Sequence, residues 1–250
     1  MTYFEGFIVP VPESNKDAFV GHANHLSSAL GECGVRRQLE AWDSDIPDGK
    51  VTDFRKAVDA RADEKIVFAW FEYPDRQARD AANEAMMSNP KMAQMGTDVP
   101  FDARRMILGG FEAIVEEGSG GGNYVDGFIV PVPQGKLEAY RALASKMANI
   151  FRQHGANRVV ECFGDDVPKG QVTDFYRAVK AEDGEGVVFS LIEWPNEEVR
   201  NRAWDKIMAD ESIRPQEMPF DGKRMFWGGF DVVIDTAQLQ APQALTPISA

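Results

Sequence analysis

The chain contains the same seven-residue segment twice. Gly-Phe-Ile-Val-Pro-Val-Pro occupies Gly6–Pro12 and recurs without a mismatch at Gly127–Pro133, about halfway along the 250 residues. Recurrence of this kind predicts that one structural unit has been duplicated. Positions that match between the copies therefore indicate shared elements, and positions that differ indicate where the copies have diverged.

The duplication divides the chain into two repeats. We expect a first repeat over residues 1–117, a linker over 118–123, a second repeat over 124–235 and a tail over 236–250. The linker reads Gly-Ser-Gly-Gly-Gly-Asn, a composition typical of flexible connections. A linker this short spans at most about 20 Å, so the two repeats must be neighbours. The tail has no periodic pattern, and we expect it to be disordered or to lie as an arm over the surface.

Hydrophobic periodicity predicts the same element order in each repeat. In the first repeat we expect a strand at 3–9, a helix at 15–33, strands at 35–42 and 65–73, a helix at 75–88 and a strand at 104–116. Pro10 and Pro12 are expected to end the first strand, and Val51–Phe54 to be a short extended piece in a long loop. Asp75 and Asn196 are expected helix N-caps.

This order, β-α-β-β-α-β, is that of the ferredoxin-like fold. Such a unit carries helices on one face of an antiparallel sheet, so the other face should be polar when the unit exists alone. Here the strands at 3–9, 66–71 and 106–115 are apolar on both faces, so the open face needs a cover. We therefore predict an α+β chain of two ferredoxin-like repeats whose antiparallel sheets pack as an intrachain pseudo-dimeric α/β barrel.

Composition argues against several classes of partner. The formal net charge is −13, and both repeats are acidic, which disfavours nucleic acid and anionic membranes as partners. No apolar run is long enough for a membrane span, and the N-terminus has no secretory signal pattern. Cys33 and Cys162 lie at non-equivalent positions of the repeats, so we expect no disulfide and a cytoplasmic location.

Five motifs in order resemble one family. They are Gly-Phe-Ile-Val-Pro-Val-Pro, Glu-Cys-Phe-Gly-Asp-Asp-Val-Pro at 161–168, Val-Thr-Asp-Phe-Tyr-Arg-Ala-Val at 172–179, Met-Pro-Phe-Asp-Gly-Lys-Arg-Met at 218–225, and Gly-Gly-Phe at 228–230. They resemble the YbaA-like family, domain of unknown function 1428. The resemblance covers nearly all of each repeat and implies the dimeric α/β-barrel superfamily, with single-domain members that would pair. It implies no particular activity, and repeat 1 departs from the pattern at 40–45, so a site that needs Cys162 or Asp165 would exist once.

Residues kept in both repeats are the first candidates for a ligand site. The residues expected to bind a ligand are Asp53, Asp174, Arg105, Arg224, Gly109, Gly228, Trp70 and Trp227. Two alternatives stay open for them. The aspartates of the repeated Val-Thr-Asp-Phe segment could cap a turn, and the strand glycines could mark a β-bulge.

Acids within apolar strands are the candidates for catalysis. Glu161 and Glu193, with their counterparts Glu40 and Glu72, lie in such strands, where burial would raise a carboxyl pKa and suit acid–base chemistry. Asp174 is a further candidate. The alternative for the glutamates is pairing with arginines of neighbouring segments or exposure at a sheet edge.

The histidines and cysteines favour structural interpretations. His22 and His25 have a spacing that allows metal ligation, but their counterparts are Leu143 and Lys146, which favours a structural role. Cys162 has acidic neighbours, which favours an inert buried thiol over a reactive one. No glycine-rich phosphate-binding pattern is present, and the sequence predicts no metal and no cofactor.

Three classes of function remain open. The first is binding of a small, partly apolar molecule with an acidic or carbonyl group, in a cavity between each sheet and its own helices, lined by Phe68, Trp70, Phe189 and Trp227. The second is a cofactor-independent enzyme, monooxygenase- or isomerase-like, by analogy with the superfamily. The third is a structural or protein-interaction module. The expected partner is an unknown small molecule, and a further homo-oligomer is compatible with the sequence.

Overall fold

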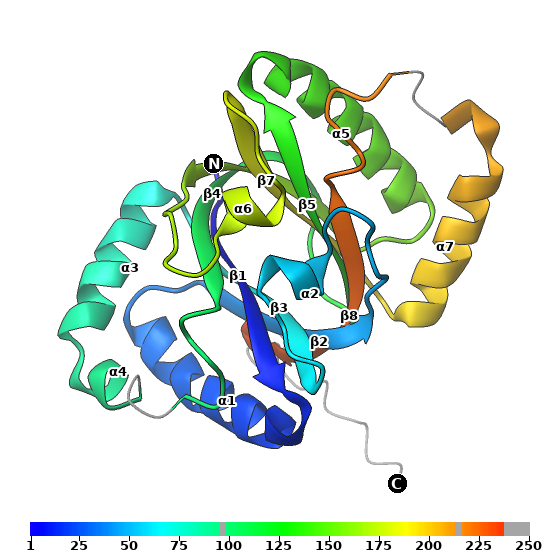
Figure 1. Cartoon of the computed structure of the whole chain (residues 1–250). Helices are drawn as coiled ribbons and strands as arrows, with labels where there is room; N and C mark the ends of the chain where they lie inside the picture. Colours follow the sequence, from blue (N-terminus) through cyan, green and yellow to red (C-terminus); the bar gives the residue numbers. More distant parts are fainter. Residues whose placement is uncertain (96–98, 214–216, 238–250) are drawn as a thin grey trace, which may run out of the picture.

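The computed structural model describes residues 1–95, 99–213 and 217–237, so most of the expected tail lies outside the described residues. Within them, eight antiparallel strands form a closed barrel in the order β1-β3-β2-β8-β5-β7-β6-β4 (Figure 1). Repeat 1 contributes β1 (Tyr3–Pro12), β2 (Arg37–Asp45), β3 (Glu64–Tyr73) and β4 (Ile107–Gly118). Repeat 2 contributes β5 (Tyr124–Pro133), β6 (Arg158–Asp166), β7 (Glu185–Trp194) and β8 (Phe226–Asp235). The two halves thus build one α/β barrel.

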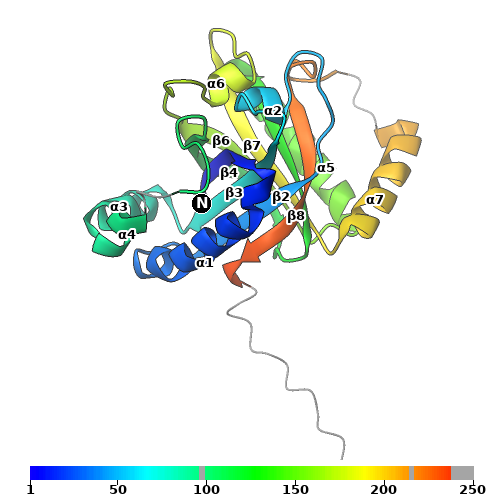
Figure 2. The same cartoon turned by 60° about the horizontal axis from the view of Figure 1, so that its bottom comes forward.

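The longer helices pack on the outside of this barrel (Figures 1 and 2). They are α1 (Lys16–Glu32), α3 (Arg76–Ser88) and α4 (Pro90–Met95) on repeat 1, and α5 (Leu137–Gln153) and α7 (Glu197–Ala209) on repeat 2. Short 3-10 turns are η1 (Glu13–Asn15), η2 (Gln134–Lys136) and η3 (Glu211–Ile213). The predicted N-caps are confirmed, because the side chains of Asp75 and Asn196 accept hydrogen bonds from backbone N–H groups in the first turns of α3 and α7.

Two seams join the repeats edge to edge. β2 pairs with β8, and β4 pairs with β6. Each seam is crossed by an ion pair: Arg79 of α3 lies 2.6 Å from Asp166 of β6, and Arg200 of α7 lies 3.0 Å from Asp45 of β2. The sheets that were predicted to cover each other therefore also share their edges, which leaves no open edge among the described strands.

Aromatic rings from both repeats fill the barrel interior. Phe68 of β3 and Phe189 of β7 stack with centroids 4.6 Å apart. Gly6 and Gly127 of the repeated segment lie against these rings, since a Cβ at Gly6 would lie 2.6 Å from the Phe189 ring and one at Gly127 would lie 2.9 Å from the Phe68 ring. The glycine of each copy thus makes room for the phenylalanine of the other repeat.

The strand end expected before Pro10 was wrong, whereas β1 does end at Pro12. β1 continues to Pro12, which pairs with Glu64 of β3, whereas its pairing with β4 stops at Ile8. Beyond Ile8 the strand has one neighbour, so a proline that lacks an N–H can occupy it without a lost ladder bond. Pro10 therefore lies within the strand, in the part that pairs with β3 alone.

The segment expected to be extended at Val51–Phe54 instead starts a one-turn helix. α2 (Phe54–Ala57) and its counterpart α6 (Phe175–Ala178) close one end of the barrel (Figure 2). The hydroxyl of Thr52 donates to the carbonyl oxygen of Ala178 at 2.6 Å, and that of Thr173 donates to the carbonyl oxygen of Ala57 at 2.7 Å. These reciprocal bonds attach each closing helix to the other repeat.

The repeated Gly-Gly pairs lie where the seams change register. β4 and β6 shift register at Gly110, and β8 and β2 shift at Gly229. The rings of Tyr3 and Tyr124 lie against these two glycines, closer than a Cβ would permit. The Gly-Gly pairs therefore lie at β-bulges, which was one of the two alternatives for them. The groups that approach these glycines closely are tyrosine side chains.

Candidate functional site

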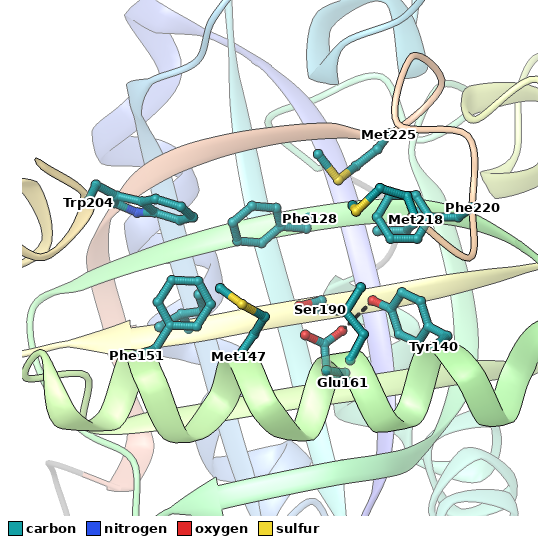
Figure 3. A pocket seen from close by; sticks show the side chains of 14 residues that line it. Phe128, Tyr140, Met147, Phe151, Glu161, Ser190, Trp204, Met218, Phe220 and Met225 are labelled. Atoms are coloured by element: carbon teal, nitrogen blue, oxygen red, sulfur yellow. Dashed lines mark hydrogen bonds between the residues drawn. The ribbon is translucent and has the colours of Figure 1, made fainter. Parts of the chain in front are cut away.

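A cavity of about 210 Å³ lies between the outer face of the repeat 2 sheet and helix α5 (Figure 3). Its walls come from β5, β6, β7, α5, α7 and the segment before β8. The lining residues are Phe128, Val130, Tyr140, Leu143, Ala144, Met147, Phe151, Glu161, Ser190, Ile192, Trp204, Met218, Phe220 and Met225. We refer to it as the repeat 2 cavity. Its position between a sheet and its own helices is where the sequence predicted a cavity.

Glu161 is the acid of the repeat 2 cavity. On β6 its neighbours Val160 and Cys162 belong to the barrel interior, so strand alternation turns Glu161 outward toward α5. The Tyr140 hydroxyl donates a hydrogen bond of 2.7 Å to Oε2 of Glu161. Burial raises the pKa of Glu161 to about 7, while hydrogen bonds from Tyr140 and Ser190 limit the rise. The carboxyl can therefore change its charge near neutral pH.

The remaining wall of the repeat 2 cavity is almost entirely apolar. It contains aromatic rings at both ends, with Trp204 and Phe151 at one and Phe220 at the other, while Glu161 and Met147 lie between them (Figure 3). Within residues 1–95, 99–213 and 217–237, no lysine, arginine or histidine lines it. An acidic group on a ligand would therefore face Glu161 with no cation among the described lining residues, which disfavours the acidic group, one of the two that were expected.

Trp204 is held in place by a buried acid behind the wall. Its indole N–H donates to Asp126 at 2.8 Å, and Asp126 also accepts from the indole N–H of Trp194 at 2.9 Å. Arg200 Nε donates to the other oxygen of Asp126 at 2.8 Å. Burial raises the pKa of Asp126, and the arginine opposes that shift. The network fixes the orientation of one aromatic wall of the cavity.

Repeat 1 has a smaller counterpart of this cavity. It measures about 150 Å³ and contains Glu40, the equivalent of Glu161. Phe19 and Ala69 stand where repeat 2 has Tyr140 and Ser190, so both hydroxyl partners are missing. Instead the side-chain amide of Gln38 donates to Glu40 at 3.0 Å, and burial raises the pKa of Glu40 to about 7. The acid is common to both repeats, but its hydrogen-bonding partners are not.

Glu193 and Glu72 form ion pairs with arginines, which was the alternative to a catalytic role. Arg37 Nη2 lies 2.7 Å from Glu193 Oε2, and Arg158 Nη1 lies 2.7 Å from Glu72 Oε1. Asp235 of β8 joins the same cluster through Arg37 at 2.8 Å. Although burial raises the pKa of Glu193, hydrogen bonds and charge from Arg37 hold it below its ordinary value. The cluster ties the two repeats together at the linker end of the barrel.

The predicted aspartates and glycines do not line the repeat 2 cavity. Asp53 and Asp174 are the N-caps of α2 and α6, each accepting a hydrogen bond from the backbone N–H of the third residue of the helix. A Cβ at Gly109 would meet Phe111 and Val167, and Gly228 lies similarly close to barrel residues. A part for these residues in ligand binding stays a prediction.

The predicted arginines lie in ion pairs at the start of β3 and β7. Arg105 Nη2 lies 2.6 Å from Glu64 Oε1, and Arg224 Nη1 lies 2.6 Å from Glu185 Oε2. Hydrogen bonds from these arginines lower the pKa of both glutamates. The two arginines thus attach the loops before β4 and β8 to the barrel, away from the repeat 2 cavity.

The aromatic lining expected for the cavity was wrong. Phe68, Trp70 and Phe189 belong to the barrel interior. Trp227 lies outside the cavity, and the centroid of its ring is 5.5 Å from the guanidinium carbon of Arg200. Their strands are apolar on both faces, so alternation alone does not identify the inward face. Tyr140 and Ser190 were not among the predicted site residues, although their change to Phe19 and Ala69 between the repeats was a signal.

The structure places Cys162 and two of the histidines. Cys162 is fully buried in the barrel interior, and burial raises its pKa well above the ordinary value, so the inert alternative holds. His22 borders the repeat 1 cavity, and His154 is the C-cap of α5. Among the described residues no group of three or more His, Cys, Asp or Glu side chains could hold a metal ion.

A family model described as "Protein of unknown function (DUF1428)" matches residues 2–103 and again residues 123–222. The chain belongs to this family. The uncharacterized protein YbaA of Escherichia coli strain K12 is 51% identical over 117 residues, which are 47% of this chain and 100% of YbaA. A YbaA of Shigella flexneri matches equally, at 51% over the same length. A whole relative is thus about as long as one repeat.

Solved structures with the same fold align along nearly the whole chain. A proposed monooxygenase from Fusobacterium nucleatum has a TM-score of 0.56 at 10% identity, covering 94% of this chain and 93% of that one. A proposed monooxygenase from Lactobacillus acidophilus has a TM-score of 0.57 at 10% identity, covering 94% and 95%. An anthrone oxidase-like protein has a TM-score of 0.51 at 13% identity, covering 94% and 92%. At these identities the likeness shows the fold alone.

No helix in the described part of the chain has the length and apolarity to cross a membrane.

Proposed function

We propose that the protein binds a small, partly apolar molecule in the repeat 2 cavity. The observation that carries the proposal is one carboxyl, Glu161, with two hydroxyl neighbours in an otherwise apolar space of about 210 Å³. A dry apolar cavity of about 150 Å³ is large enough to bind benzene. The repeat 2 cavity therefore has room for one aromatic ring and a short chain, with Glu161 as the polar contact.

The proposal extends to the organisation of the chain. Residues 1–117 and 124–235 are two repeats joined covalently by 118–123, as a pseudo-dimer of the kind that single-repeat relatives would form by pairing. Reciprocal bonds between α2 and α6 and ion pairs across both seams support this. The free state of both cysteines supports a reducing compartment such as the cytoplasm.

Indole, a neutral aromatic probe, tests whether the cavity binds. Isothermal titration calorimetry should show binding to the natural chain. Ala144→Leu places an isobutyl group in the repeat 2 cavity and should abolish it, because Ala144 lines that cavity. Ala23→Leu makes the same change in repeat 1 and serves as the control. Indole binding that survives Ala144→Leu would contradict the assignment to the repeat 2 cavity.

Proton transfer by Glu161 is a second candidate function. A carboxyl with a pKa of about 7 in an apolar cavity is suited to take a proton from a carbon beside a carbonyl group and return it, without a cofactor. The monooxygenase names of two fold neighbours are compatible with an enzyme but carry no residue roles. Enolisable ketones incubated in D₂O should gain deuterium, and Glu161→Gln should stop this whereas Glu40→Gln should not.

A further inference from the structure

We propose that the ligand of the repeat 2 cavity is a small arylalkylamine that binds as a cation, with its ammonium group on Glu161. The inference rests on the function proposed above and names the ligand class for that site. It follows from the charge of the wall, the geometry around Glu161 and the contrast with repeat 1.

The charge of the wall favours a cation. Among the residues that the structure describes, Glu161 is the only carboxyl that lines the repeat 2 cavity, and no lysine, arginine or histidine of that part of the chain lines it. A carboxylate in an apolar space is costly unless a positive charge or several donors compensate it. An anionic ligand would add repulsion, and a neutral ligand would leave the charge in place. An ammonium group compensates it, and the chain's net charge of −13 favours the approach of cations.

The geometry leaves acceptor capacity for an ammonium group. Tyr140 donates to Oε2 of Glu161, and Ser190 is the other hydroxyl partner. A carboxylate offers about four acceptor positions, so positions remain for ammonium N–H groups. The Tyr140 ring stands beside Glu161 with the Phe220 ring 5.7 Å away between centroids (Figure 3). Aromatic faces within about 6 Å attract a cation, which adds to the carboxylate.

The far end of the cavity suits an aromatic ring. Phe151 and Trp204 form an edge-to-face pair with centroids 5.1 Å apart, and Phe128 lies 6.2 Å from Trp204. The Met147 side chain lies between this end and Glu161 (Figure 3), and a thioether adapts readily to an aromatic neighbour. A ring placed here leaves a short alkyl chain to reach Glu161, which matches the room for one ring and a short chain.

Repeat 1 provides an internal control for this chemistry. Glu40 keeps the carboxyl, but Phe19 and Ala69 replace the two hydroxyl residues, and the cavity is about 150 Å³ rather than 210 Å³. The amide of Gln38 already donates to Glu40. We therefore assign the amine to repeat 2 alone.

Two probes of nearly the same shape test the ligand class at pH 8. 2-Phenylethylamine is cationic there, and 2-phenylethanol is its neutral counterpart. Calorimetric titration of the natural chain should give a Kd for the amine at least about tenfold lower than for the alcohol. The amine affinity should also rise about tenfold from pH 6 to pH 8, because burial raises the pKa of Glu161 to about 7 and the carboxylate that pairs with the amine forms across that range. Phenylacetate, an anion, should not bind.

Variants locate the preference. Glu161→Gln should lower amine affinity to about that of the alcohol for the same variant, whereas Glu40→Gln should leave the affinities for both probes unchanged. Equal affinity of the natural chain for amine and alcohol would overturn the amine inference while supporting binding in the cavity. A preference for the amine that survives Glu161→Gln would overturn it as well. Failure of indole and both phenyl probes to bind would overturn the proposed function itself. The comparison on the natural chain needs no variant to fold.

Discussion

Glu161 is an ionisable residue that the fold buries in an apolar environment, where its charged form is disfavoured. It lies on a strand whose neighbours enter the barrel interior, and its carboxyl meets Tyr140 and an apolar helix face instead of water. Its counterpart Glu40 keeps the raised pKa with an amide partner. Both repeats thus retain an acid whose environment favours the neutral form.

Glu161→Gln should change how stability depends on pH. Burial raises the pKa of Glu161 from its ordinary value of 4.5 to about 7, so the native chain holds an extra proton between those pH values. The contribution of this carboxyl to the free energy of unfolding therefore falls by on the order of 3 kcal/mol as pH rises from about 4.5 to 7. The Glu161→Gln variant should lack this pH-dependent contribution. Urea unfolding of both chains from pH 4 to 8 measures the difference.

The control for this prediction is Glu138→Gln on α5, where the glutamate side chain is 83% exposed. Its pH profile should follow that of the natural chain. A Glu161→Gln profile parallel to the natural one across pH 4.5 to 7 would show that the carboxyl is not perturbed by folding.

Gly6→Ala should destabilise the chain through a single methyl group. A Cβ at Gly6 would lie 2.6 Å from the buried Phe189 ring, and overpacking of this kind costs about 1–3 kcal/mol. Gly21→Ala is the matched control, because nothing lies within 4 Å of a Cβ there and alanine favours a helix by about 1 kcal/mol. Thermal unfolding should move in opposite directions for the two variants. A Gly6→Ala chain as stable as the natural one would contradict the packing account.

At the scale of elements, the closing helices α2 and α6 connect local and long-range structure. Asp53 and Asp174 start these helices as caps, while the threonine before each aspartate bonds to the other repeat. Phe54 and Phe175, the next residues, are fully buried in the barrel interior. Both polar residues of the repeated Val-Thr-Asp-Phe segment, the threonine and the aspartate, therefore have structural roles.

Thr173→Val should loosen this closure. The variant keeps the shape but leaves the carbonyl oxygen of Ala57 without its donor, which costs about 1–3 kcal/mol for a buried acceptor. Thr52→Val should have a similar cost, because its bond to Ala178 is the reciprocal one. Urea midpoints measure both, with Ser14→Ala at an exposed serine as a control expected to change little. Unchanged midpoints for both valine variants would show that these bonds contribute nothing net.

At the scale of the whole molecule, closure of the barrel requires both repeats. One edge of β2 pairs with β3 and the other with β8 of repeat 2, and one edge of β4 pairs with β1 and the other with β6 of repeat 2. The stacked rings of Phe68 and Phe189 also come from opposite repeats. The ion cluster of Arg37, Glu193 and Asp235 likewise draws on both repeats. Each half alone would expose two strand edges and an apolar face.

Repeat 2 expressed alone, as residues 118–250, should therefore form homodimers or aggregate. Light scattering after size-exclusion chromatography measures its mass, and the full chain is the reference. Co-expression with residues 1–117 should restore a soluble one-to-one complex, because the seams re-form. A stable, soluble monomer of repeat 2 would contradict the view that the repeats form one closed body.

The sequence by itself determined the duplication, the order of elements and the need to cover both sheet faces. Periodicity and turn residues are local properties, so caps such as Asp75 and Asn196 and a closed body could be predicted from them. The strand end at Pro10 could not, because a proline breaks pairing on one side only and the sequence does not say which neighbours a strand has.

Only the tertiary structure decided which face of each strand meets the cavity. Phe189 and Ser190 are consecutive, yet one fills the barrel and the other lines the cavity. In a strand that is apolar on both faces, alternation does not identify the inner one. Tyr140 and Glu161 are likewise 21 residues apart and meet only because α5 packs across β6. The candidate site therefore depends on long-range packing, which is the information that a local pattern lacks.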